Sequence, residues 1–248
     1  MPRQARKKSK TNIYHIMLRG INQQIIFEDH EDYERFIKTL AKYQAISGYS
    51  IYAYCLMSNH IHLLIKEGKE NLEQIIKRIA GSYVYWYNWK YNRSGHLFQD
   101  RFKSEPVETD EYFLTVIRYI HQNPVKAKVT TDISKYEFSS YTEYLRAGSA
   151  IVDKEFVYSI IDKPKFVEFN HENNDDVCLD IEEQSNRIND GEAKEIIKQV
   201  CGYSNASEIQ KLDIAERNKC VKVLKESGLS IRQISRITGV SKYAVEHA

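Results

Sequence analysis

Residues 49–66 read YSIYAYCLMSNHIHLLIK, two runs of β-forming residues separated by the dipeptide Ser58-Asn59. Two such runs around a short polar connection predict a β-hairpin whose second strand begins near His60. Because side chains alternate between the faces of a strand, His60 and His62 point to the same side of the sheet. The other predicted elements are arranged around this hairpin.

Four further segments of the first hundred residues have a clear periodicity. NIYHIMLRG, residues 12–20, predicts a first strand with His15 and Met17 on one face. Apolar residues at helical spacing predict helices over 29–47 and 71–91. HLFQDRFKSEPVE, residues 96–108, predicts a fourth strand, which its proline allows only at a sheet edge. The order strand, helix, strand, strand, helix, strand predicts an α+β fold, a ferredoxin-like antiparallel sheet with helices on one face. The other face is then left for a ligand.

A third helix is predicted from an N-cap at Thr109 to Asn123-Pro124. Tyr119 and Asn123 lie four residues apart and therefore project from the same flank of this helix. Residues 134–147 predict a further helix, or a loop followed by a helix, that completes the core.

The chain of 248 residues, 42% of them hydrophobic, is long enough for one sizeable core or two modest domains. No apolar run approaches a membrane span and no secretion signal is visible, so we expect no membrane association and a cytoplasmic location. The four cysteines have no C-x-x-C spacing and are expected to be reduced thiols: Cys55, Cys178, Cys201 and Cys220.

Charge is unevenly distributed along the chain. Residues 1–150 carry 22 Lys and Arg against 16 Asp and Glu, residues 151–190 carry 4 against 11, and residues 191–248 carry 10 against 7. Two basic ends joined by an acidic middle indicate two modules that face nucleic acid. Residues 2–10 are expected to form a flexible basic arm drawn to phosphates, or a solvated tail. We expect a catalytic domain over 1–150, an acidic and partly helical connector over 151–205, and a third unit over 206–248.

The third unit has the spacing of a helix-turn-helix. Its helices are separated by turns at Gly228 and Gly239, with Ser230 and Ser241 as N-caps. This pattern predicts a DNA-binding unit, although helical hairpins that contact only protein share it.

The H-x-H pair is half of a divalent-metal site, because two neutral imidazoles on one face need one more ligand and leave positions open for a substrate oxygen. Taken alone, the same pattern also fits a structural interpretation, in which His60 ends a turn and His62 is an ordinary half-buried residue. A metal held by His60, His62 and Asn123 would draw charge from a phosphodiester and allow the Tyr119 hydroxyl to attack it, leaving a covalent phosphotyrosine. Rival nucleophiles lie on the second helix: Tyr83, Tyr85, Tyr87 and Tyr91. His121 is interpreted as structural, and His15 as able to face the site without a stronger claim.

Several motifs in one order resemble the single-tyrosine HUH endonucleases, and in particular the REP-associated tyrosine transposases. The resemblance covers about residues 10–147 and rests on these stretches: YHIMLRGINQQIIF, LMSNHIHLLI, GHLFQDRFKS and RYIHQNPVKA. It implies the HUH fold, with His60 and His62 as metal ligands, Tyr119 as the nucleophile and Asn123 as the third ligand.

The resemblance also implies cleavage and rejoining of single-stranded, hairpin-forming DNA with Mg2+ or Mn2+, by a monomer or a homodimer. Basic residues are candidates for DNA contacts: Arg19, Arg93, Arg101, Lys103, Arg118, Lys126 and, in the last unit, Lys242. One alternative is a non-catalytic DNA-binding regulator that acts through the helix-turn-helix. Another is a metal hydrolase that uses activated water.

Overall fold

A computed structural model describes residues 6–146, 151–180, 190–203 and 206–248. The chain divides into two compact units, Met1–Asp180 and Ile181–Ala248. This division differs from the predicted boundaries, because the first part of the expected connector packs into the N-terminal unit and a helix from its last part belongs to the C-terminal unit. The start of the predicted arm, residues 2–5, and the centre of the predicted connector, residues 181–189, lie outside the described residues.

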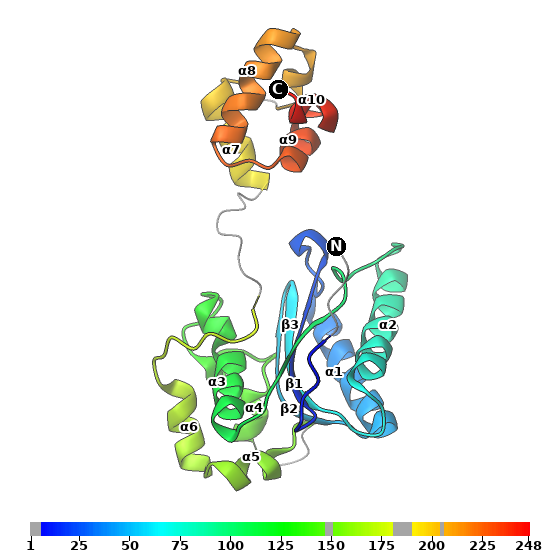
Figure 1. Ribbon diagram of the computed structural model, residues 1–248, viewed down its shortest axis with the longest axis vertical. Coiled ribbons are helices and arrows are strands. Elements are labelled where there is room, and N and C mark those ends of the chain that lie inside the picture. Colours follow the sequence, from blue (N-terminus) through cyan, green and yellow to red (C-terminus); the bar gives the residue numbers. More distant parts are fainter. Residues whose placement is uncertain (1–5, 147–150, 181–189, 204–205) are drawn as a thin grey trace. The chain divides into compact units, whose positions relative to one another are not determined.

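The N-terminal unit is built on a four-stranded antiparallel sheet (Figure 1). Its strands are β1 (Ile13–Arg19), β2 (Ser50–Met57), β3 (His60–Lys66) and β4 (Lys103–Pro106), in the order β2-β3-β1-β4. This is the ferredoxin-like order, and it confirms the predicted fold class. Pro106 lies in an edge strand as expected, because proline has no backbone N–H to donate to a neighbouring strand.

Two helices cover one face of the sheet (Figure 1). Helix α1 (His30–Ser47) is capped by Asp29 and ends at Gly48, whose φ of 68° places it in the left-handed region. Helix α2 (Leu72–Lys90) is capped by Asn71. A short 3-10 turn, η1 (Ile21–Gln23), follows β1.

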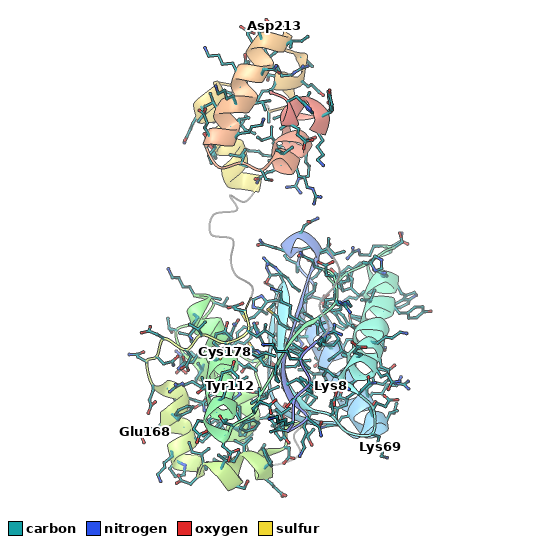
Figure 2. All side chains as sticks on the ribbon, in the orientation of Figure 1. Lys8, Lys69, Tyr112, Glu168, Cys178 and Asp213 are labelled. Carbon is teal, nitrogen blue, oxygen red and sulfur yellow. The ribbon has the colours of Figure 1, made fainter. Side chains whose placement is uncertain are left out.

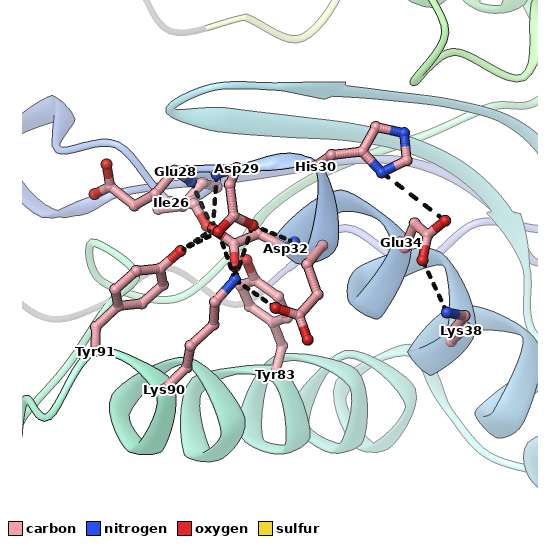
Figure 3. Close-up of polar contacts among 11 residues, drawn as sticks. Ile26, Glu28, Asp29, His30, Asp32, Glu34, Lys38, Tyr83, Lys90 and Tyr91 are labelled. Carbon is pink, nitrogen blue, oxygen red and sulfur yellow. Dashed lines mark hydrogen bonds and ion pairs between the residues drawn. The ribbon is translucent and has the colours of Figure 1, made fainter.

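The start of α1 is held to the end of α2 by one lysine (Figure 3). Lys90 Nζ lies 2.8 Å from Asp29 Oδ1, 2.8 Å from Asp32 Oδ1 and 2.9 Å from Glu31 Oε2. Burial alone would lower the pKa of Lys90, but hydrogen bonds with Asp29, Asp32 and Glu31 raise it above its ordinary value. The cluster therefore keeps its charges and ties the two helices together.

Helix α3 (Asp110–Lys126) packs on the opposite face of the sheet, against β2 and β3 (Figure 1). The prediction of helices on only one face is therefore wrong. Helix α3 covers part of the second face, which was expected to be open to a ligand. The helix also continues through Asn123-Pro124 to Lys126, although Pro124 has no N–H to donate to the preceding turn.

The rest of the unit closes the edge of the sheet at β2. A 3-10 turn, η2 (Ile133–Lys135), and a short helix, α4 (Tyr141–Leu145), follow α3. Leu56 N donates to Phe138 O at 3.0 Å, and Ser140 N donates to Tyr54 O at 2.9 Å. Helices α5 (Lys154–Ile160) and α6 (Lys163–His171) then pack beside α3.

The C-terminal unit has a separate apolar core. It contains α7 (Asp190–Cys201), the 3-10 turn η3 (Ala206–Lys211), α8 (Ile214–Glu226), α9 (Ile231–Thr238) and α10 (Lys242–Glu246). Ser230 and Ser241 cap α9 and α10, and Gly239 has a φ of 77°, as the predicted turn requires. None of the described helices is both long and apolar enough to span a membrane.

Candidate active site

Two histidines from neighbouring strands meet on the sheet face that α3 covers. His62 pairs with Met17 of β1, and His15 lies two residues before Met17, so His15 and His62 share one face. His15 Nε2 lies 3.0 Å from His62 Nδ1, and both residues are fully buried. His62 Nε2 has no hydrogen-bond partner among the described residues, although it is buried. A buried nitrogen without a partner costs free energy, and a place as a metal ligand would account for it.

The other histidine of the H-x-H pair, His60, meets Asn123 of α3. The rings of His60 and His62 have centroids 5.2 Å apart, and His60 Nε2 lies 3.1 Å from Asn123 Oδ1. His60 Nδ1 lies 2.7 Å from Asn59 Oδ1, which orients the ring. The structure thus brings His60, His62 and Asn123 together, from elements that are far apart in the sequence.

Tyr119 lies over the same histidines. Its ring centroid is 5.7 Å from that of His62 and 5.9 Å from that of His15. Only 4% of Tyr119 is exposed. The rival tyrosines are not comparably placed, because they lie on α2 or, for Tyr91, at its C-cap, and α2 covers the other face of the sheet.

Burial keeps the histidines neutral. Loss of solvent lowers the pKa of His15 to about 3 and holds that of His62 well below its ordinary value. The pKa of His60 is also lowered, chiefly by burial. A neutral imidazole has a free lone pair, which is the form that binds a metal ion.

The Tyr119 hydroxyl donates a hydrogen bond to Asp180, a residue that sequence reasoning left unassigned. Burial raises the pKa of Tyr119 above its ordinary value, and the bond to Asp180 raises it further. Asp180 ends a segment, residues 172–180, that runs along α3; Figure 2 shows Cys178 of this segment beside Tyr112 of α3. The only signal in the sequence for this contact was the acidic character of the segment.

The same segment binds Arg118, one of the residues predicted to contact DNA. Arg118 Nη1 donates to Glu172 Oε2 at 2.8 Å, and Arg118 Nε donates to Asp176 Oδ2 at 2.8 Å. Arg118 is 9% exposed, and its guanidinium lies 3.9 Å from the Phe169 ring centroid. The structure therefore places Arg118 in an internal ion-pair network instead of on an open basic surface.

The other candidate DNA contacts are spread over both units. Arg19 pairs with His60 across β1 and β3, and Arg93 lies 5.5 Å from the Tyr87 ring centroid. Lys126 Nζ lies 4.8 Å from the Tyr119 ring centroid. Arg101 and Lys103 are exposed and line a cavity beside β4. Lys242 begins α10 in the C-terminal unit.

The donor set fits a divalent metal ion. Within the described residues no group of three or more His, Cys, Asp and Glu side chains is arranged for a metal, and the side chain beside His60 that offers a third donor is the amide of Asn123. His60, His62 and the carbonyl oxygen of Asn123 would supply two nitrogens and one oxygen. Such a set suits ions that accept both kinds of donor.

The chain resembles known proteins both in fold and in sequence. The fold is the α+β type of a REP-associated tyrosine transposase whose structure was solved bound to a REP hairpin. The likeness has a TM-score of 0.50 at 16% identity and covers 62% of this chain and 94% of that chain. Residues 8–123 match the model of the family described as IS200-like transposase. This stretch, just under half of the chain, is therefore similar to that family.

A second solved structure, a putative transposase from Deinococcus radiodurans, has a TM-score of 0.35 and 15% identity. It covers 49% of this chain and 97% of that chain. No curated protein matched the sequence.

Proposed function

We propose that this protein is a metal-dependent tyrosine transposase that cleaves and rejoins single-stranded, hairpin-forming DNA. The observation that carries the proposal is the meeting of Tyr119 with the His60, His62 and Asn123 cluster on one sheet face. The match of residues 8–123 to the IS200-like transposase family supports DNA as the substrate. The likeness in fold to a REP-associated tyrosine transposase bound to a REP hairpin supports hairpin-forming DNA as the substrate.

In the proposed reaction the Tyr119 hydroxyl attacks a DNA phosphorus. A bond forms between the phenolic oxygen and phosphorus, the bond from phosphorus to one strand oxygen breaks, and the proton lost by the phenol ends on the leaving strand. The covalent phosphotyrosine conserves the bond energy, so a second strand can reverse the step without ATP. His15 orients His62, and the burial of Tyr119 keeps competing water away from the hydroxyl.

A divalent ion, Mg2+ or Mn2+, would be held by His60, His62 and Asn123 and would polarise the phosphodiester oxygen. The His62 nitrogen without a hydrogen-bond partner supports a ligand at this position. The two imidazoles favour Mn2+ over Mg2+, which prefers oxygen ligands.

A labelled single-stranded DNA hairpin incubated with the protein and Mn2+ tests the proposal. We expect an adduct that survives SDS, is located on Tyr119 by mass spectrometry, and is lost in Tyr119→Phe. His62→Ala should abolish the adduct while DNA binding is retained. Cleavage that persists in Tyr119→Phe would instead support a hydrolase that uses activated water.

A second function is favoured by the C-terminal unit. Its separate core and its Ser230 and Ser241 caps build the helices that a helix-turn-helix needs. The alternative proposal is therefore a non-catalytic regulator that binds duplex DNA through α9 and α10. No adduct with any hairpin, together with tight duplex binding, would support the regulator.

A further inference from the structure

Helix α2 presents two large aromatic side chains to solvent. Tyr85 is 80% exposed and Trp89 is 75% exposed, although both belong to an ordered helix of 19 residues whose other face is buried. Residues four apart lie on the same side of a helix, so the two rings form one patch instead of two isolated apolar residues. Contiguous apolar patches on a folded protein mark sites of interaction.

Gly81 extends the same row by one further turn. It is exposed, and a Cβ built at this position would have no neighbouring atom within 4 Å. Glycine is unfavourable in a helix interior, yet Gly81 does not have the positive φ that would require it. Neither the backbone nor the packing within the described residues explains the glycine. Its effect is a notch in the helix surface beside the two rings.

The row formed by Gly81, Tyr85 and Trp89 is complementary to itself. Gly81 and Trp89 are each four residues from Tyr85, on opposite sides of it, so the notch and the indole are equally distant from the central ring. Rows of residues four apart on two packed helices become parallel when the helices cross at about −50°, the commonest packing angle. In an antiparallel pair with a two-fold axis at Tyr85, Trp89 of each copy therefore faces Gly81 of the other. A two-fold interface requires such a self-complementary surface.

The charges of this face favour a second copy over nucleic acid. Arg78 lies on the same side of α2, but its Nη2 is 2.7 Å from Glu70 Oε1 and its Nε is 2.9 Å from Glu70 Oε2. The guanidinium is therefore already paired within the chain, whereas a nucleic-acid surface needs cations that can meet phosphates. Gln74, also exposed on this side, carries no charge, and Lys77 projects from the flank of the helix, outside the row. Pairing of two copies would bury no uncompensated charge at the row.

The exposed area suffices for a weak association. A buried aromatic side chain removes about 150–250 Å² from water, so the four rings of a pair would bury about 600–1,000 Å². Specific interfaces begin at about 1,000 Å², which the flanking parts of α2 would complete. Because α2 covers the sheet face opposite to α3, such a pair would leave Tyr119 and His62 uncovered (Figure 1).

We propose that Gly81, Tyr85 and Trp89 of α2 form the contact surface for a second copy of this chain, in an antiparallel two-fold pair. The two Tyr85 rings meet at the axis, and each Trp89 ring occupies the notch at Gly81 of the other copy. This proposal does not depend on the proposed function, because it uses only the helix layer on the sheet face opposite to the candidate active site.

Sedimentation velocity of the full chain without DNA, over a range of protein concentrations, tests the proposal. We expect the sedimentation coefficient to rise with concentration as the dimer forms. Trp89→Ala removes one ring from each side of the pair and should weaken association about 30-fold or more, as the loss of a central aromatic residue does in other interfaces. Tyr243→Ala is the matched control and should leave association unchanged, because Tyr243 is 74% exposed but lies in the C-terminal unit.

Gly81→Leu separates the notch from the stability of the helix. Leucine is a better helix former than glycine, and the space at this position is open, so the thermal unfolding temperature should not fall. The added side chain fills the notch, however, and should weaken association about tenfold or more. A variant that is fully folded and yet monomeric would not be explained by a structural role of Gly81 within one copy.

The fluorescence of Trp89 reports on the same contact. The chain has two tryptophans, so Trp86→Phe leaves Trp89 as the only indole. Its emission should move to shorter wavelength as the protein concentration rises, because the ring leaves water on pairing.

The proposal is overturned if the protein remains a monomer up to millimolar concentration, or if Trp89→Ala and Gly81→Leu associate like the Tyr243→Ala control. Trp89 emission that responds to an added DNA hairpin but not to protein concentration would also overturn it, because that result assigns the row to nucleic acid.

Discussion

His62 is the residue whose surroundings are most specific to its proposed role. Its Nε2 can bind a metal only if Nδ1 carries the proton and donates to His15 Nε2, which lies 3.0 Å away. His15 would then set both the tautomer and the orientation of His62, as outer-shell partners of metal-bound histidines do. The first-strand histidine thus acquires a positioning role that its sequence context did not indicate.

We therefore expect His15→Leu to weaken Mn2+ binding by about 10- to 100-fold, because His62 loses its acceptor. His15→Gln, whose amide oxygen can accept the same hydrogen bond, should recover part of the affinity. Calorimetric titration with Mn2+ measures both variants without any DNA. Equal affinities in His15→Leu and the unsubstituted protein would contradict the positioning role.

Asp180 raises the pKa of Tyr119, the proposed nucleophile. A carboxylate at the hydroxyl favours the protonated phenol, and its charge also opposes an approaching phosphate. Asp180→Asn should therefore lower the pKa of Tyr119. More phenolate is then present at a given pH, so the curve of adduct rate against pH should move to lower pH, with about tenfold in rate for each pH unit.

The adduct rate measured across pH with a labelled hairpin checks this prediction. Asp175→Asn is the control, because Asp175 is an exposed residue of the same segment. A slower reaction in Asp180→Asn than in the unsubstituted protein would contradict the prediction and indicate that Asp180 accepts the proton of Tyr119.

At the scale of elements, the layer formed by α1 and α2 depends on Lys90. Asp32 is fully buried and also accepts from Glu28 N at 2.6 Å and from the Tyr91 hydroxyl at 2.8 Å. Without Lys90 its charge would remain buried without a cation. Removal of one partner of a buried pair is costly for this reason.

Lys90→Met should lower the free energy of unfolding by about 3 kcal/mol, the lower end for a buried pair, because 17% of the Lys90 side chain is exposed. Urea denaturation followed by circular dichroism measures the change. Lys38→Met, which removes a cation from the exposed pair with Glu34, should change stability little. Equal effects of the two substitutions would contradict the role of the buried cluster.

Helix α3 joins the candidate site to the rest of the fold. His121, on this helix, is fully buried, with Nδ1 2.7 Å from Asn170 Oδ1 and Nε2 2.9 Å from Ser140 Oγ. Burial lowers the pKa of His121 to about 4, so it stays neutral near pH 7. These contacts agree with its interpretation as a structural residue, since they fix α3 from the side opposite to Tyr119.

At the scale of the whole molecule, the charge pattern has two consequences. Part of the acidic middle region neutralises Arg118 inside the N-terminal unit, so it is more than a spacer. The basic C-terminal residues belong to a unit with its own core, which includes the fully buried Ile234 of α9. The two units can therefore be perturbed separately.

Ile234→Asp places a charge in the core of the C-terminal unit and should unfold that unit. We expect duplex DNA binding to be lost, while the hairpin adduct on Tyr119 still forms. Duplex binding by gel shift and adduct formation on the same sample check both parts. Loss of the adduct together with duplex binding would show that the two activities depend on one another.

The sequence by itself determined the local elements of this protein. Periods of two and of 3.6 residues marked the strands and helices, because each element must bury one face. Capping residues such as Thr109 and Ser230 and the turn at Gly239 have local causes and lie where they were expected. The order of these elements was enough to predict the sheet, because few topologies accommodate it.

Only the tertiary structure decided which side chains meet. The pairs His15 with His62, Asp180 with Tyr119, and Arg118 with Asp176 join residues 47, 61 and 58 positions apart. No local periodicity in the sequence predicts such contacts. They depend on strand order, on the face to which α3 docks, and on the return of the acidic segment across that helix. The same packing formed the cavity beside β4, which is lined by residues from four parts of the chain.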